Sequence, residues 1–127
     1  MTAAPRPRVL IVEDEQPLRE LVSVTLSEEF DCDEVSDGEA ALERLRASPP
    51  RLVVLDSMLP GRSGIDVLRE MRADPKLRDV PVLMLSAWQS AADVDGAMDA
   101  GADSFLGKPF KVEELVSVAH ELAGRSG

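Results

Sequence analysis

Short, unbroken apolar runs alternate along the chain with longer segments in which apolar residues recur every three or four positions. Unbroken runs are typical of strands buried on both faces of a sheet, and the periodic segments are typical of amphipathic helices. The predicted strands cover residues 9–12, 31–35, 52–55, 80–85 and 104–106. Because residues 31–35 are largely polar, we place that strand at an edge of the sheet.

A helical segment follows each predicted strand. The first helix has its apolar stripe at Leu18, Leu21, Val22 and Leu26. Ser36 with Glu39 predicts a capping box for the second helix, and Ser63 with Asp66 predicts the cap of the third. The fourth, at residues 90–100, is rich in alanine and only weakly apolar. The alternation of strand and helix occurs five times.

This alternation predicts an α/β fold. Strand–helix–strand units with short loops require parallel strands and right-handed crossovers. Helices on both faces of such a sheet make it doubly wound. The carboxyl ends of all strands then share one edge, which is where ligands bind in open parallel sheets.

Composition narrows the class of protein. The 127 residues suffice for one domain, which we expect at 8–124, between a lead-in at 1–7 and a tail at 125–127. A net charge of -10 argues against direct binding of nucleic acid or an anionic membrane. A single cysteine, Cys32, suits a reducing compartment. No apolar stretch approaches the roughly 20 residues of a membrane span. We therefore expect a soluble, cytoplasmic protein.

Four of the predicted strands deliver polar groups to the shared edge, namely Glu13 and Asp14, Asp56, Ser86, and Lys108. Clustered carboxylates repel one another and need a cation at neutral pH. Oxygen ligands without histidine or cysteine favour Mg²⁺, with Mn²⁺ as the alternative. A carboxylate beside such an ion can attack phosphorus, and Lys108 can neutralise phosphoryl oxygens.

Taken alone, each residue also has a simpler explanation. Acidic residues are favourable at a helix N-terminus, Ser86 fits a turn serine, and Lys108 fits a surface lysine. Trp88 fits a residue that anchors a loop, and His120 fits a solvated side chain. The convergence of several strand ends on one edge favours a site.

Four motifs occur in order: VEDE at 12–15, LDSMLPG at 55–61, LSA at 85–87 and AGADSFLGKPF at 100–110. On these motifs the sequence resembles the receiver domain of bacterial two-component response regulators, of the chemotaxis-regulator type, along nearly its whole length. The resemblance implies a flavodoxin-like, three-layer sandwich of five helices and a five-stranded parallel sheet in the order 2-1-3-4-5.

The resemblance also implies a site. Asp56 would accept a phosphoryl group from a sensor histidine kinase, a phosphotransfer protein or a small phosphodonor. Asp14, Asp56 and the main-chain carbonyl of Met58 would bind Mg²⁺, and Glu13 would act through water.

Further residues of the implied site would respond to the phosphoryl group. Ser86 and Ala87 would bind it and Lys108 would pair with it. Phe105 would be the switch aromatic that moves inward with Ser86. The bond between Lys108 and Pro109 would be cis.

Some positions depart from common family members. Met58 and Trp88 stand where the family tunes phosphoryl lifetime, and this apolar pair predicts slow self-hydrolysis. Val94 and Val118 stand where many members have basic residues for salt bridges across a dimer, and Ser104 stands where they often have an aspartate. An apolar contact with another protein is therefore an alternative to a phosphorylation-dependent homodimer.

The implied function is a phosphorylation-activated switch of a two-component phosphorelay. It would act on a downstream protein or a C-terminal output domain through the fourth helix, fifth strand and fifth helix, and it would catalyse only its own phosphorylation and dephosphorylation. Because the chain begins at Met1, we expect an N-terminal receiver.

One alternative is an aspartyl-phosphate phosphatase of the haloacid-dehalogenase type, although Met58 stands where that class needs a second aspartate. The other is a phosphate-independent, receiver-like binding module.

Overall fold

The computed structural model describes residues 6–125, in which five strands and five helices alternate. The strands are β1 (Arg8–Val12), β2 (Asp31–Val35), β3 (Leu52–Asp56), β4 (Val82–Ser86) and β5 (Ser104–Gly107). The helices are α1 (Gln16–Leu26), α2 (Gly38–Ala47), α3 (Gly64–Ala73), α4 (Ala91–Ala100) and α5 (Val112–Arg125). Of the expected lead-in and tail, residues 1–5 and 126–127 lie outside the described residues.

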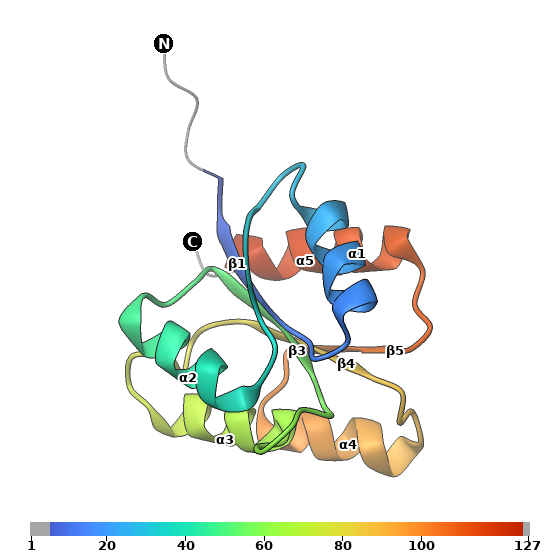
Figure 1. The fold of residues 1–127 in the computed structure, drawn as a ribbon. Coiled ribbons are helices and arrows are strands. Elements are labelled where there is room, and N and C mark those ends of the chain that lie inside the picture. Colours follow the sequence, from blue (N-terminus) through green and yellow to red (C-terminus); the bar gives the residue numbers. More distant parts are fainter. Residues whose placement is uncertain (1–5, 126–127) are drawn as a thin grey trace.

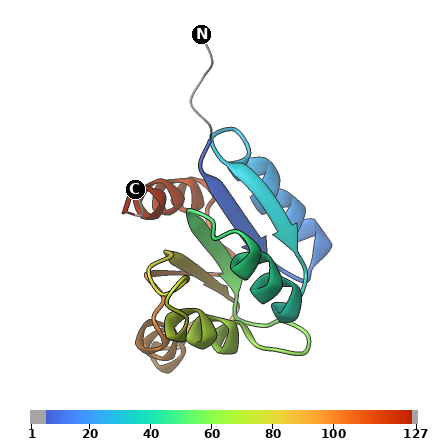
Figure 2. The same ribbon diagram turned by 90° about the vertical axis from the view of Figure 1, so that its left-hand side faces the viewer.

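All neighbouring strands are parallel, in the order β2-β1-β3-β4-β5, which confirms the predicted topology. Helices α1 and α5 cover one face of the sheet, and α2, α3 and α4 cover the other (Figures 1 and 2). The polar strand β2 lies at one edge, as its sequence predicts. Within residues 6–125, no helix has the length and apolarity that a membrane span requires.

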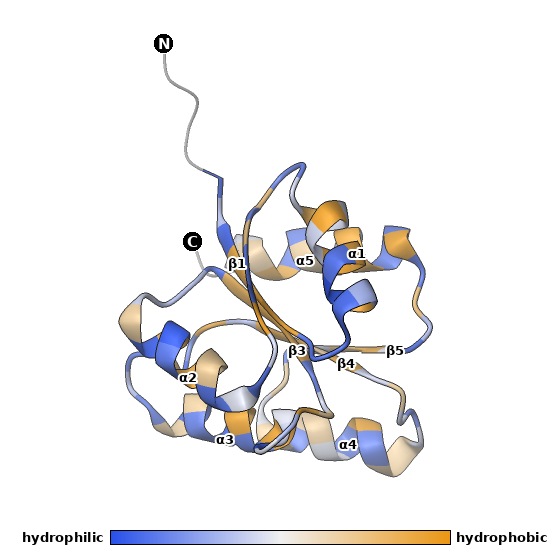
Figure 3. Ribbon diagram, viewed as in Figure 1, coloured by the Kyte–Doolittle hydropathy of each residue, from blue (hydrophilic) through white to orange (hydrophobic). Residues whose placement is uncertain are grey.

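Strand β3 lies between two hydrophobic cores and is buried along its whole length. Val53 and Leu55 pack into the core under α2, α3 and α4, whereas Leu52 and Val54 pack into the core under α1 and α5. This division follows from the pleat, which turns successive side chains to opposite faces. The apolar centre and the polar outer faces of the helices are visible in Figure 3. Asp56 is therefore held at the end of a strand that is buried along its whole length.

Two local predictions are wrong. The cap of α2 is Asp37, whose carboxylate accepts a 2.8 Å hydrogen bond from the N–H of Ala40, because the helix begins one residue later than the Ser36 box requires. Leu21 is not in the core, since 46% of it is exposed. The buried stripe of α1 is narrower than predicted and is centred on Val22 and Leu26.

Candidate functional site

Three carboxylates meet at the carboxyl edge of the sheet. Val12 of β1 pairs with Leu55 of β3, so the residues that follow them, Glu13 and Asp56, emerge side by side. Oxygens of Glu13, Asp14 and Asp56 lie within 4.8 Å of one another. Glu13 and Asp56 are buried, with 1% and 2% of their surfaces exposed, whereas Asp14 is exposed. The cluster thus opens to solvent at Asp14.

Lys108 is the cation that faces this cluster. Its Nζ lies 2.8 Å from Oε1 of Glu13 and 3.1 Å from Oδ2 of Asp56. Burial alone would lower the pKa of Lys108, but the hydrogen bond with Glu13 and the charge of Asp56 outweigh it, so the pKa rises above its ordinary value. Burial raises the pKa of Glu13 to about 7, in spite of the hydrogen bonds from Lys108 and the main-chain N–H of Glu15. Lys108 is therefore a charged ammonium at neutral pH.

The loop after β5 fixes Lys108 through its main chain. The N–H of Lys108 donates to the carbonyl of Ser86 at 2.8 Å, and the side-chain amide of Gln89 donates to the carbonyl of Lys108 at 2.5 Å. The Lys108–Pro109 peptide bond is cis, as the resemblance implies. A Cβ on Gly107 would lie 2.1 Å from the side-chain amide of Gln89, so a larger residue there would displace this side chain. Gln89 has no local sequence signal that marks it as a site residue.

The loop after β3 fixes Asp56 in the same way. The N–H of Met58 donates to Oδ1 of Asp56 at 3.2 Å. The N–H of Ser57 continues the ladder to Leu85 at 2.9 Å, and its carbonyl accepts from Gly64 at 3.0 Å. A Cβ on Gly64 would lie 2.0 Å from the carbonyl oxygen of Asp56. Gly64 is thus required for the close approach of α3 to the end of β3, a role that the sequence did not reveal.

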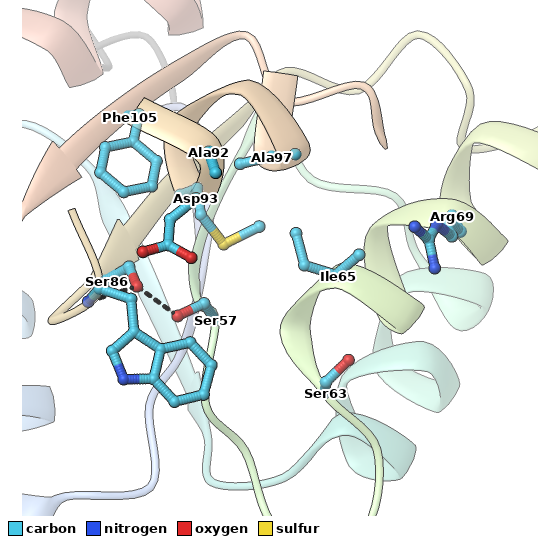
Figure 4. Close-up of a pocket in the computed structure, with 12 residues that line it drawn as sticks. Ser57, Ser63, Ile65, Arg69, Ser86, Ala92, Asp93, Ala97 and Phe105 are labelled. Carbon is cyan, nitrogen blue, oxygen red and sulfur yellow. Dashed lines mark hydrogen bonds between the residues drawn. The ribbon is translucent and has the colours of Figure 1, made fainter. Parts of the chain in front are cut away.

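Ser86, at the end of β4, turns its hydroxyl toward a cleft between α3 and α4. Its Oγ accepts hydrogen bonds from Oγ of Ser57 at 2.6 Å and from the N–H of Trp88 at 3.0 Å (Figure 4). The cleft has a volume of about 320 Å³, and half-buried Phe105 lines it together with these three residues. Ala87 is exposed beside it. Sequence analysis missed Ser57, since nothing local shows that it reaches Ser86.

The predicted site residues therefore fall into two groups. Glu13, Asp14, Asp56 and Lys108 form one cluster, whereas Ser86, Trp88 and Phe105 border the cleft. Met58 and Trp88 lie at the rim, with 47% and 56% of their surfaces exposed. Their N–H groups anchor the two loops to Asp56 and Ser86.

The donor set fits Mg²⁺. It consists of carboxylate oxygens, and hard divalent cations prefer such ligands. Three carboxylates face one lysine ammonium, so their full ionisation leaves an excess of negative charge. Two of the carboxylates are buried, where unbalanced charge is most costly. A divalent cation would balance this charge.

Comparison with known proteins agrees with this geometry. The model of the response regulator receiver domain family matches residues 9–120, and the chain belongs to this family. The comparisons support the receiver, and they give no support to the haloacid-dehalogenase phosphatase.

Two curated relatives are named as regulators, and each is about twice as long as the region that it shares with this chain. The DNA-binding response regulator MtrA of Mycobacterium tuberculosis is 44% identical over 113 residues, which are 88% of this chain and 48% of the relative. The phosphate regulon transcriptional regulatory protein PhoB of Escherichia coli is 40% identical over 111 residues, 87% of this chain and 48% of that protein. The chain thus spans about half the length of the curated relatives it matches.

Solved structures show the same fold. The receiver domain of the Francisella response regulator 1452 has a TM-score of 0.91 at 28% identity, covering 96% of this chain and 100% of that one. The receiver domain of the sensor histidine kinase PA1611 from Pseudomonas aeruginosa, with a magnesium ion coordinated in its active site cleft, has a TM-score of 0.87 at 28% identity, covering 94% of this chain and 98% of that one.

Proposed function

We propose that this chain is a phosphorylation-activated switch that accepts a phosphoryl group on Asp56 from a sensor histidine kinase or a phosphotransfer protein. The observation that carries the proposal is the contact of one half-buried ammonium, Lys108, with both Glu13 and Asp56 at the carboxyl edge of the sheet. A nucleophilic carboxylate beside a fixed positive charge is what aspartyl phosphorylation requires.

The transfer exchanges one bond for another. An Oδ of Asp56 attacks phosphorus, and the bond from phosphorus to the histidine nitrogen breaks, leaving its electron pair on the imidazole. Lys108 faces the phosphoryl oxygens and stabilises their charge. Asp14, Asp56 and the main-chain carbonyl of Met58 would hold Mg²⁺, with Glu13 acting through water. When bound, the ion supplies further positive charge to the phosphoryl oxygens.

The response starts at Ser86. Its hydroxyl and the main chain of Ala87 bind the new phosphoryl group, and Ser86 leaves its place in the cleft. Phe105 lines the same cleft, so it can move inward when Ser86 turns. Because Phe105 belongs to β5, which lies beside β4 and contacts α4, this movement alters the α4–β5–α5 face.

We infer the partners from the family of the chain and from its net charge. We propose a cytoplasmic domain that receives its phosphoryl group from a kinase and controls a downstream protein or a C-terminal output domain. Its relatives are named as DNA-binding or transcriptional regulators and are about twice as long as the matched region. With a net charge of -10, this chain does not bind nucleic acid itself. It catalyses only its own phosphorylation and dephosphorylation.

The α4–β5–α5 face suits an apolar contact. Val94 and Val118, which replace basic residues common in dimerising members, are half-buried, and 42% of Met98 is exposed. A phosphorylation-dependent homodimer held by salt bridges across the interface lacks its basic partners at these two positions. We therefore rank contact with a different protein above the homodimer.

Met58 and Trp88 extend the proposal to the lifetime of the phosphoryl group. Their main chains bind Asp56 and Ser86, and their bulky side chains are partly exposed next to these residues. We propose that they restrict attacking water, so that Met58→Ala and Trp88→Ala each shorten the lifetime of the aspartyl phosphate. Decay of the purified phosphorylated chain measures this, and rapid decay of the wild type would contradict it.

Binding of beryllofluoride, which mimics a phosphoryl group on a carboxylate, tests the proposed function. With Mg²⁺ present, it should change the fluorescence of Trp88, the single tryptophan. The variant Asp56→Asn and a sample with a chelator in place of Mg²⁺ should not respond. A wild type without response would favour the phosphate-independent binding module instead.

A further inference from the structure

Ser57, the residue after Asp56, is hydrogen-bonded to the side chain at the start of the response. Its hydroxyl donates to Oγ of Ser86 at 2.6 Å, and the N–H of Trp88 donates to the same oxygen at 3.0 Å. A hydroxyl oxygen has two acceptor positions. In Ser86 Oγ, both positions are occupied by these two donors. Figure 4 shows Ser57 and Ser86 pointing toward one another. Ser86 is 2% exposed, so water competes little for it.

The main chain of Ser57 is fixed on both sides. Its N–H donates to the carbonyl of Leu85 at 2.9 Å, and its carbonyl accepts from the N–H of Gly64 at 3.0 Å. The first bond continues the ladder between β3 and β4, and the second ties the residue to the start of α3. The Ser57 hydroxyl therefore reaches Ser86 from a fixed position.

We propose that Ser57 is a positioning residue that holds the Ser86 hydroxyl toward the α3–α4 cleft and so opposes its turn toward a phosphoryl group on Asp56. The inference rests on the proposed function and adds a residue to it. The Ser57–Ser86 hydrogen bond is present in the resting arrangement and must break when Ser86 turns. A ligand that binds only when Ser86 is turned toward Asp56 has to overcome the free-energy difference between the resting and the turned arrangement. Its apparent affinity therefore falls.

The size of this effect follows from the kind of bond. A neutral hydrogen bond contributes about 1 kcal/mol net, which corresponds to about fivefold in a dissociation constant. Half-buried Ser57 can bond to water after Ser86 leaves, which keeps the effect from being larger. Mg²⁺ binding by the carboxylates involves neither hydroxyl, and we expect Ser57 to leave it unchanged.

Titration calorimetry with beryllofluoride at saturating Mg²⁺ tests this role in the full chain. Ser57→Ala should bind beryllofluoride about fivefold more tightly than the wild type, with unchanged affinity for Mg²⁺ alone. Ser57→Thr, which keeps the hydroxyl, should restore the wild-type value. Ser63→Ala is the matched control, because Ser63 lines the same cleft and caps α3 without contacting Ser86.

A double-variant cycle separates positioning from a general structural effect. In a Ser86→Ala background, Ser57→Ala should have no further effect, because the bond that it removes is already gone. Equal or weaker beryllofluoride binding by Ser57→Ala, or the same tightening in both backgrounds, would overturn the inference. A wild type that fails to bind beryllofluoride would instead overturn the proposed function, and this inference with it.

Discussion

One ammonium shared by two buried carboxylates dominates the site at the scale of single residues. Lys108 contacts Glu13 and Asp56, and burial raises the pKa of Glu13 to about 7. Lys108 therefore has two roles. It is a counter-charge for the carboxylates, where it competes with a divalent cation, and it is a partner for phosphoryl oxygens.

These two roles predict opposite effects of Lys108→Ala. Mg²⁺ should bind more tightly, since a competing cation is removed from the carboxylates. Beryllofluoride should bind about tenfold more weakly or worse, because a hydrogen bond to a charged group contributes about 1.5–3 kcal/mol. Calorimetric titration measures both, with Lys111→Ala, an exposed lysine nearby, as control. A change of both affinities in the same direction would contradict this assignment.

Cys32 provides a second prediction, on pH. Burial, followed by the charges of Asp31 and Glu34, raises the pKa of the Cys32 thiol from 9.0 to about 11. A raised pKa means that the neutral thiol stabilises the fold below pH 9 and that this contribution is lost as pH rises through 11. At pH 9, alkylation of the folded chain should be roughly fiftyfold slower than that of the urea-unfolded chain, in proportion to thiolate. Equal alkylation rates for the folded and the unfolded chain would contradict the raised pKa of Cys32.

Helix caps decide local stability at the scale of elements. Asp37 caps α2, although sequence reasoning favoured Ser36. Helix α4 is capped at both ends, by a box of Ser90 with Asp93 and by Gly101 at a φ of 113°. Arg72 of α3 donates to the carbonyl of Gly101 from Nε and Nη2, at 3.0 and 2.8 Å. The caps thus stabilise a helix whose sequence is only weakly apolar.

The α2 cap can be tested directly. Asp37→Ala should lower the free energy of unfolding by about 1 kcal/mol, because the N–H of Ala40 loses its acceptor. Ser36→Ala should change it by less than about 0.5 kcal/mol, since Ser36 is exposed and is not the cap. Urea titrations of the two variants give the comparison. The reverse order would restore the Ser36 capping box.

Sequence periodicity predicted the elements because each depends on neighbours in the chain. The apolar runs gave β1, β3 and β4, and the polar character of residues 31–35 placed β2 at the edge. The site residues that sequence reasoning missed depend on contacts between distant segments. Ser57 matters through Ser86, and Gln89 through the carbonyl of Lys108. A single sequence carries no local signal for such contacts.

At the scale of the whole molecule, topology creates the site. Parallel pairing in the order β2-β1-β3-β4-β5 brings residues that are far apart in sequence to one edge, so that Lys108 meets Glu13 across the central strands. The same arrangement places the cleft at Ser86 beside Phe105 and α4. Under the proposed function, this cleft is the route by which a change at Asp56 would reach the α4–β5–α5 face.

The proposed function depends above all on the acceptance of a phosphoryl group by Asp56 in a Mg²⁺-dependent reaction. Incubation with acetyl phosphate and Mg²⁺, followed by intact-mass and peptide mass spectrometry, tests it most directly. We predict one phosphoryl group per chain, located on Asp56, absent without Mg²⁺ and absent in Asp56→Asn. An unmodified wild type, or a phosphoryl group that persists in Asp56→Asn, would contradict it.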